Sequence, residues 1–423
     1  MHMSGHPPAI VPCQRKRGKR KQQFFKSVLK RALFFSKKGS GRVFLLNEDL
    51  KFPEWEYNSM VYQPYRLKPS FSAKRIYQWY DYFDGKIYVS FSGGLDSTIL
   101  SFLVCQTYRE YRLEGPVRLV FSDTGTEFPE VRAFTCCYVE WLKKKFPEQE
   151  IDFETIRQKE GWNFKRVCSE KGFPILSKDT ANKIWKLRYG KLGERYRNYL
   201  LHGDERGKFG MLAARWQYLA DKKVTPFDIS SACCKILKIE PFRRYHKRTG
   251  NYPMLGITQD ESLRRKNLYR YTGCNVYEGT TVKSQPIAFW TRQDVLRFKE
   301  EHQIPICSVY GNVIRKRGGC LDTAGEKRTG CILCGFGCQM EKEPNRIQRL
   351  SVSPVLAHRR IYEWGMQLEN NGITYQEALE HCGIPTRTWE SEGQMNLIQF
   401  PQIFPENSKV RSEEHTSELQ SRI

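Results

Sequence analysis

A chain of 423 residues can bury one large core, or one core with a helical annex. Its hydrophobic content of 39%, with no stretch near the roughly 20 apolar residues of a membrane span, excludes a membrane-embedded protein and predicts a cytoplasmic one. The formal net charge of +24 favours a polyanionic partner, and fourteen cysteines without an export signal favour reduced thiols over disulfides.

Both ends of the chain are set apart from the predicted domain. Residues 1–42 hold twelve Lys and Arg and no Asp or Glu, within a predicted basic N-terminal extension over residues 1–70. The segment 14–38 is either a basic arm that contacts nucleic-acid phosphates or an unstructured extension, and the sequence leaves both open. Residues 411–423 resemble a translated sequencing adapter, so we exclude them from every site argument.

Strands and helices alternate from residue 74 onward. Helical spacing or strand-like apolar runs predict the following order: helix 74–83, strand 87–91, helix 96–108, strand 117–121, helix 130–146 and strand 151–155. Successive βα units indicate a parallel sheet with right-handed crossovers. The sequence therefore predicts an α/β fold with a doubly wound parallel sheet.

The predicted α/β domain spans residues 71–310, and a helical insertion interrupts its second half. Residues 177–230 are helical, aromatic and basic, a pattern typical of base-stacking surfaces but more typical of an amphipathic helical pair packed on the sheet. A strand over 254–257 and a helix that a capping box opens at Thr291 follow. A cysteine-rich loop over 311–350 and C-terminal helices over 351–410 complete the expected organisation.

The most informative motif joins the first strand to its helix. Ser92-Gly93-Gly94-Leu95-Asp96-Ser97 is a turn of small residues at a helix start, which is how backbone amides are brought to a phosphate. The two glycines remove Cβ atoms that would hold a phosphate away, and the two serines add hydroxyl donors. Asp96 either caps the helix or ligates a magnesium ion on nucleotide phosphates.

This motif resembles the PP-loop of the ATP pyrophosphatase superfamily, whose fold is Rossmann-like and adenine nucleotide alpha-hydrolase-like. Other segments are similar, in family order, to the phosphoadenosine phosphosulfate (PAPS) reductase family. These are 120–130, Cys233-Cys234-Lys235, 256–265, 289–295 and 331–334. The resemblance covers about residues 72–385.

The resemblance implies a nucleotide site for ATP or for PAPS or APS. The residues it assigns to nucleotide binding are Ser92, Gly93, Gly94, Asp96, Ser97, Asp123, Thr124, Gly125 and Glu127. Because the loop has no lysine, positive charge must come from elsewhere, and the matching segments offer Lys178, Lys235, Arg264 and Arg265. We expect Asp96, Lys178 and Arg264 to be catalytic.

Two pairs of cysteines predict a metal centre. Cys233-Cys234 followed far downstream by Cys331-x-x-Cys334 is similar to the [4Fe–4S] motif of adenylylsulfate reductases, and adjacent cysteines reach two irons of a cubane more easily than one zinc. The alternative is a four-thiolate Zn²⁺ knuckle. Its ligands would be Cys320, Cys331, Cys334 and Cys338.

One departure separates this chain from sulfonucleotide reductases. Those enzymes share a C-terminal cysteine nucleophile, whereas the last cysteine here, Cys382, falls on the apolar face of a helix that ends at Gly383. The intact PP-loop indicates retained ATP chemistry with Mg²⁺, in which the α-phosphate is cleaved and pyrophosphate leaves during sulfur transfer or nucleotide modification. A sulfite-producing reductase and a nucleic-acid phosphorothioation-type protein are the alternatives, and a thiol or sulfur-donor protein is an expected partner.

Overall fold

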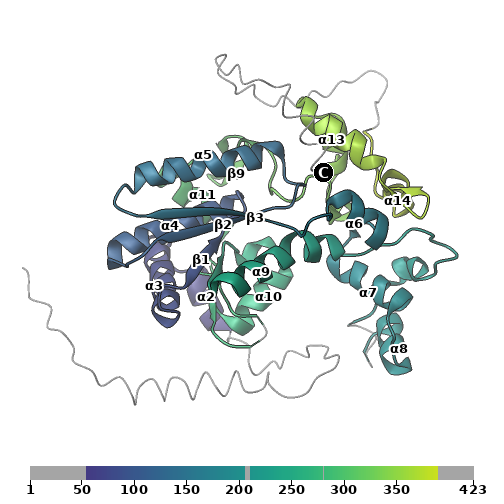
Figure 1. The fold of residues 1–423 in the computed structure, drawn as a ribbon, viewed down its shortest axis with the longest axis horizontal. Coiled ribbons are helices and arrows are strands. Elements are labelled where there is room, and N and C mark those ends of the chain that lie inside the picture. The colour runs from purple at the N-terminus through teal and green to yellow at the C-terminus, as the bar shows by residue number, and fades with distance from the viewer. Residues whose placement is uncertain (1–53, 205–209, 280, 389–423) are drawn as a thin grey trace, which may run out of the picture.

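The computed structural model describes residues 54–204, 210–279 and 281–388 (Figure 1). The basic segment 14–38 and the adapter-like residues 411–423 lie outside these ranges, and so does most of the predicted N-terminal extension. Within them, no helix is both long and apolar enough to cross a membrane.

A six-stranded sheet forms the centre of the described residues (Figure 1). Its order is β3 (Ile151–Arg157), β2 (Val117–Asp123), β1 (Ile87–Ser90), β5 (Tyr252–Leu255), β7 (Lys283–Ser284) and β6 (Asn275–Val276). Each adjacent pair is parallel except the β6–β7 pair at the edge. The predicted α/β class with a mostly parallel sheet is confirmed.

Alternate residues of the strands face different helices, so the sheet is covered on both sides. Val89 and Leu119 join the main apolar core with residues of α4 (Leu95–Tyr111). Tyr88 and Val120 point the other way and pack with Tyr245 of α9 (Glu240–Thr249) in a second cluster. This alternation is the doubly wound arrangement that the sequence predicted.

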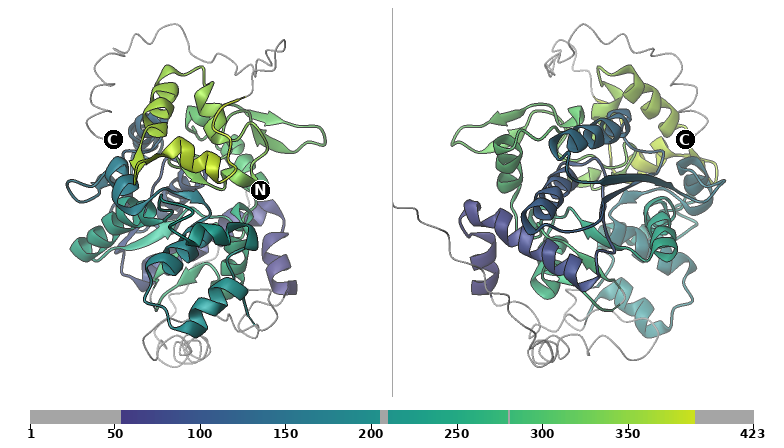
Figure 2. Two further views of the ribbon diagram at one scale, coloured as in Figure 1. Left: turned by 90° about the vertical axis from the view of Figure 1, so that its right-hand side faces the viewer. Right: turned by 60° about the vertical axis from the view of Figure 1, so that its left-hand side comes forward.

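The remaining helices surround the sheet and its insertion (Figures 1 and 2). Their bounds in chain order are α2 Glu54–Val61, α3 Lys68–Tyr82, α5 Pro129–Lys145, α6 Phe164–Lys171, α7 Lys178–Tyr189, α8 Glu194–His202, α10 Leu263–Thr272, α11 Arg292–Glu301, α12 Arg346–Ser351, α13 Leu356–Met366 and α14 Tyr375–His381. Three short pairs of strands lie outside the central sheet: β4 (Ile175–Leu176) with β10 (Gly335–Phe336), β8 (Val313–Arg315) with β9 (Leu321–Thr323), and β11 (Glu369–Asn370) with β12 (Ile373–Thr374).

The basic residue at the centre of the insertion has a structural role. The Arg188 side chain is fully buried, donates to the backbone carbonyls of Leu219, Thr225 and Phe227, and pairs with Asp228 at 3.0 Å. A guanidinium held by four acceptors in this way is not available to a nucleic acid. Arg188 therefore supports the interpretation of this region as packed helices.

Candidate functional site

The turn of residues 92–97, which resembles a PP-loop and is called the PP-loop below, lies at the carboxyl end of β1, where β2 and β5 flank the strand on either side. Such a point, where the strand order changes direction, is where open α/β sheets bind ligands. Gly93 has a φ of +68°, which favours glycine, and Gly94 precedes α4 without any side-chain cap. The hydroxyls of Ser92 and Ser97 lie 3.0 Å apart and close the loop. The residues predicted to form a phosphate cradle are thus brought together.

A second glycine supports the loop from β5. A Cβ atom on Gly256 would lie 2.6 Å from both the Cα and the backbone nitrogen of Ser97, so the strand end and the first turn of α4 are in direct backbone contact. Only a residue without a side chain permits this approach. Gly256 lies in the segment that resembles the PAPS reductase family, but its contact with the PP-loop could not be read from the sequence.

Two hydroxyls from a distant segment contact the loop. Tyr310 accepts a hydrogen bond from the Leu95 backbone amide at 2.9 Å, and Thr329 lies 2.9 Å from the Tyr310 hydroxyl. The Thr329 hydroxyl would also lie 3.0 Å from a Cβ atom on Gly94. Sequence analysis missed both residues because nothing in their local pattern marks them.

Charged side chains surround Asp96 at the start of α4. Burial, reinforced by Glu261, raises the pKa of Asp96 to about 7, while Arg292, Arg265 and Arg328 oppose the shift. Arg265 pairs with Glu261 at 2.7 Å, and Arg328 donates to the Glu261 carbonyl. Of these arginines only Arg265 was a sequence candidate. The other two were missed, although Arg292 stands inside the capping box that opens α11.

Asp123, at the end of β2, already has internal partners. Its carboxylate pairs with Arg132 at 2.7 Å and with Arg157 at 3.2 Å, and it accepts the Gly125 amide at 3.2 Å. The side chain is only 7% exposed. These contacts give Asp123 a role in shaping the loop that follows β2.

Glu127 closes the loop after β2 through its side chain, and its backbone contacts the cysteine-containing segment at Cys331. It accepts from the Thr124 amide at 3.1 Å and from the Thr124 hydroxyl at 2.6 Å. Its backbone forms a β-bridge with Cys331. The negative charge of a Cys331 thiolate raises the pKa of the partly buried Lys238 ammonium despite desolvation, and Glu127 adds to this effect.

The four cysteines of the predicted cluster set line one small cavity. Cys233, Cys234, Cys331 and Cys334 surround it, together with Lys238 and apolar side chains. The π-helical turn η5 (Cys234–Ile239) brings Cys234 and Lys238 to the same side. The hydrogen bond from Cys233, with Lys178 and Lys238 nearby, lowers the pKa of Cys234. The two cysteine pairs, about a hundred positions apart in the sequence, therefore line the same cavity, as the resemblance to the cluster motif implied.

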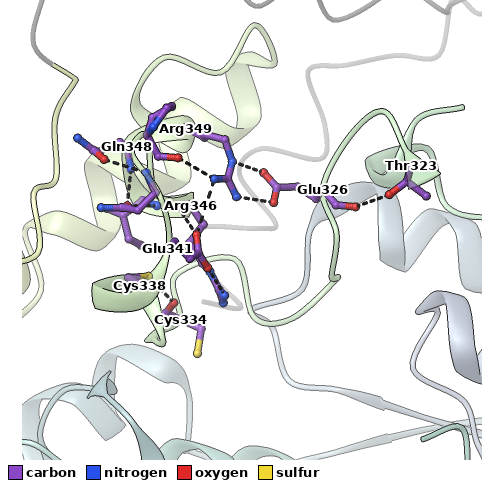
Figure 3. Close-up of polar contacts among 11 residues, drawn as sticks. Thr323, Glu326, Cys334, Cys338, Glu341, Arg346, Gln348 and Arg349 are labelled. Atoms are coloured by element: carbon purple, nitrogen blue, oxygen red, sulfur yellow. Dashed lines mark hydrogen bonds and ion pairs between the residues drawn. The ribbon is translucent and has the colours of Figure 1, made fainter. Parts of the chain in front are cut away.

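The alternative zinc set is not brought together. Cys320 is exposed in the turn between β8 and β9, and the cavity lining does not include it. Cys338 is buried and donates to the Cys334 carbonyl at 3.5 Å, on the side of an ion-pair network of Glu326, Arg349, Glu341 and Arg346 (Figure 3). Among the described residues, no group of three or more His, Cys, Asp and Glu is arranged as a metal site.

The other predicted side chains lie elsewhere. Lys178 begins α7 and is near Cys234 at the thiol cavity. Lys235 and Arg264 are exposed, and Arg264 lies near Lys283. Cys382 is 2% exposed and follows α14 in the core, as the helical pattern predicted.

Fold and site together define an α/β protein with a glycine-rich, PP-loop-like turn at the switch point of its sheet and a cavity lined by four cysteines. Residues 194–325 match the family model of the phosphoadenosine phosphosulfate reductase domain. This match, over about a third of the chain, agrees with the resemblance to the PAPS reductase family that the motifs indicate. The matched stretch begins after the PP-loop and ends before Cys331.

A solved structure with similarity to the chain is the phosphate complex of phosphoadenylyl-sulfate (PAPS) reductase from Candida auris. It is 14% identical, with 63% of this chain and 92% of that chain covered, and the TM-score is 0.29. A score this low carries no argument about the site. No curated protein matches the chain.

Proposed function

We propose that this protein is a PAPS-reductase-family enzyme that binds ATP, or a related adenylyl sulfonucleotide, at the PP-loop and transforms it there. One observation carries the proposal. The glycine turn and the open first turn of α4 lie at the switch point of the sheet, with Arg265, Arg292 and Arg328 close to Asp96. Backbone amides and guanidinium groups are the donors that bind phosphoryl oxygens.

The intact loop favours cleavage at the α-phosphate. An acceptor oxygen would attack the α-phosphorus, the bond to the bridging oxygen would break, and pyrophosphate would leave with that electron pair. Loop amides and the three arginines would stabilise the negative charge that grows on these oxygens. Asp96, once ionised, is the carboxylate best placed to hold a Mg²⁺ ion on the phosphates.

The thiol cavity supports a second part of the proposal. Cys233, Cys234, Cys331 and Cys334 line one cavity from two distant segments, which supports a [4Fe–4S] cluster there, although the described residues do not arrange these thiols as a metal site. A cluster there would supply electron-transfer or sulfur chemistry next to the nucleotide. The Lys238 ammonium, which Cys331 and Glu127 keep charged, would balance the charge of the thiolates.

Nucleotide binding and exchange of radiolabelled pyrophosphate into ATP test the proposal. We expect the wild type to bind ATP and catalyse exchange, and Asp96→Asn to lose exchange. Asp152→Asn, at an exposed position on β3, should behave as the wild type. A folded wild type that binds neither ATP nor a sulfonucleotide, and shows no exchange, would refute the proposal.

The match of residues 194–325 to the PAPS reductase domain favours sulfonucleotide reduction as a second candidate. Thiol-dependent release of sulfite from PAPS or APS would identify it, with a thiol protein as the partner. The buried position of Cys382 gives it no access to such a substrate. If sulfite is released, we therefore expect a nucleophile other than Cys382, and Cys382→Ser should retain activity in protein that stays folded.

A further inference from the structure

We propose that a basic β-ribbon between α11 and α12 is a binding surface for duplex DNA, and that it brings the duplex to the PP-loop as acceptor. The ribbon comprises residues 309–326 with β8 and β9 at its centre, and both views in Figure 2 show it projecting from the body of the protein. The inference rests on the proposed function only in calling the duplex an acceptor.

The ribbon is continuous from its root to its tip. Backbone hydrogen bonds join Glu326 to Val309 at 2.9 Å and Gly325 to Tyr310 at 2.7 Å, and the ladder continues through β8 and β9 to Lys316, which donates to Cys320 at 2.8 Å. Seven residues in each strand reach about 20 Å from root to tip. The tip is therefore well separated from the root.

The root is part of the candidate nucleotide site. Tyr310, in the ribbon, accepts from the Leu95 amide of the PP-loop, and Arg328, two residues after the ribbon, lies close to Asp96. Gly311, with a φ of +63°, adds one residue opposite the returning strand and so bends the ribbon near its root. Because the root contacts the PP-loop through Tyr310, a ligand that runs along the ribbon to its root ends near the loop.

The tip is basic and exposed. Every residue from 314 to 320 is exposed, including Arg315, Lys316 and Arg317. The two acidic residues of the ribbon are already paired, Asp322 with Lys316 and Glu326 with Arg349. Among the described residues, Arg315 and Arg317 pair with no carboxylate, so the tip presents two guanidinium groups free of ion pairs, which suit a phosphate backbone.

The shape of the surface selects the class of nucleic acid. The major groove of B-form DNA admits a two-stranded β-ribbon, whereas that of A-form RNA is too deep and narrow for side chains to read. The exposed residues of the tip include no aromatic side chain on which unpaired bases could stack. Duplex DNA is therefore favoured over both duplex RNA and single strands.

Fluorescence anisotropy with a labelled 20-base-pair DNA duplex tests the inference in the full chain. We expect the triple variant Arg315→Gln, Lys316→Gln, Arg317→Gln to bind on the order of tenfold more weakly. Its plot of log K against log salt should be flatter by about 2 to 3, near one unit per lost phosphate contact. The control is Lys143→Gln, Lys144→Gln, Lys145→Gln, which removes the same charge from the exposed end of α5 and should behave as the wild type.

Three results would overturn the inference: equal binding by the two triple variants, equal competition by duplex RNA, or equal competition by single-stranded DNA. ATP binding by the same proteins separates this inference from the proposed function. Loss of DNA binding in the ribbon variant with ATP binding intact supports the ribbon. A wild type that binds DNA through the ribbon but no nucleotide refutes the proposed function alone.

Discussion

Replacement of Gly256 by alanine tests how the PP-loop is held. The added Cβ atom would lie 2.6 Å from the Cα and N atoms of Ser97 and 2.7 Å from the carbonyl carbon of Asp96. Carbon atoms in good contact lie about 3.5 to 4.0 Å apart, so the two backbones must separate by about 1 Å. Overpacking of this kind costs about 1 to 3 kcal/mol of folding free energy.

The functional effect should exceed the loss of stability. The atoms that must move belong to the first turn of α4, whose amides are the proposed phosphate donors, and a displacement of about 1 Å can lower a rate by roughly 100-fold. Pyrophosphate exchange measures the rate, and chemical denaturation measures the free energy of unfolding. Gly193→Ala is the control, because its φ of −65° and open surroundings accommodate a methyl group. Unchanged exchange and unfolding in Gly256→Ala would show that β5 does not hold the loop.

Three further predictions concern the thiol cavity and two buried ionic groups. Cys331→Ser should abolish the iron content and brown absorption of anaerobically purified protein, whereas Cys320→Ser, at the exposed hairpin, should keep both. Colourless protein that contains zinc, and that loses the zinc in both variants, would favour the zinc set. Lys68→Met should lower the free energy of unfolding, measured in urea, by about 3 to 5 kcal/mol. The reason is that the buried Asp294 carboxylate, which pairs with Lys68 at 2.5 Å, would lose its partner. A loss below about 1 kcal/mol would contradict this reasoning. Burial raises the pKa of Glu130, but the hydrogen bond with His358 outweighs this effect and the pKa is lowered overall. The difference in unfolding free energy between the wild type and Glu130→Gln should therefore be full above about pH 4.5 and shrink as the pH falls further. A difference independent of pH would contradict the pairing of Glu130 with His358.

The first three strands of the sheet were predictable because they are short apolar runs separated by helices with a regular apolar stripe. The strand expected at 254–257 is β5, which spans 252–255, and β6 and β7, of two residues each, were not predicted because such short strands leave no pattern. Helix boundaries were less predictable: the helix expected at 74–83 is α3, which begins at Lys68. That ammonium is buried and bonded to the Val61 carbonyl at 2.7 Å as well as to a carboxylate on another helix. A lysine inside the core contradicts the ordinary apolar pattern, and only its tertiary partners explain it.

The site was predictable where motifs are local and not where it is assembled from distant segments. The glycine turn and the two cysteine pairs have spacings with a direct physical meaning. Arg292 and Arg328, in contrast, are ordinary surface-type residues in the sequence, and their approach to Asp96 depends on how α11 and the ribbon pack. Arg264 was favoured over Arg265, but the direction of the first turn of α10 brings Arg265 toward Glu261 and Asp96.

The segment between α11 and α12 links the candidate nucleotide site to the thiol cavity. It supplies Tyr310 to the PP-loop, while Cys331 lines the cavity and bridges to Glu127 through the backbone. A phosphate oxygen that takes the Leu95 amide must displace the Tyr310 hydroxyl, because one N–H donor cannot hold both in good geometry. Occupation of the loop and the position of the ribbon root are therefore coupled through this single hydrogen bond.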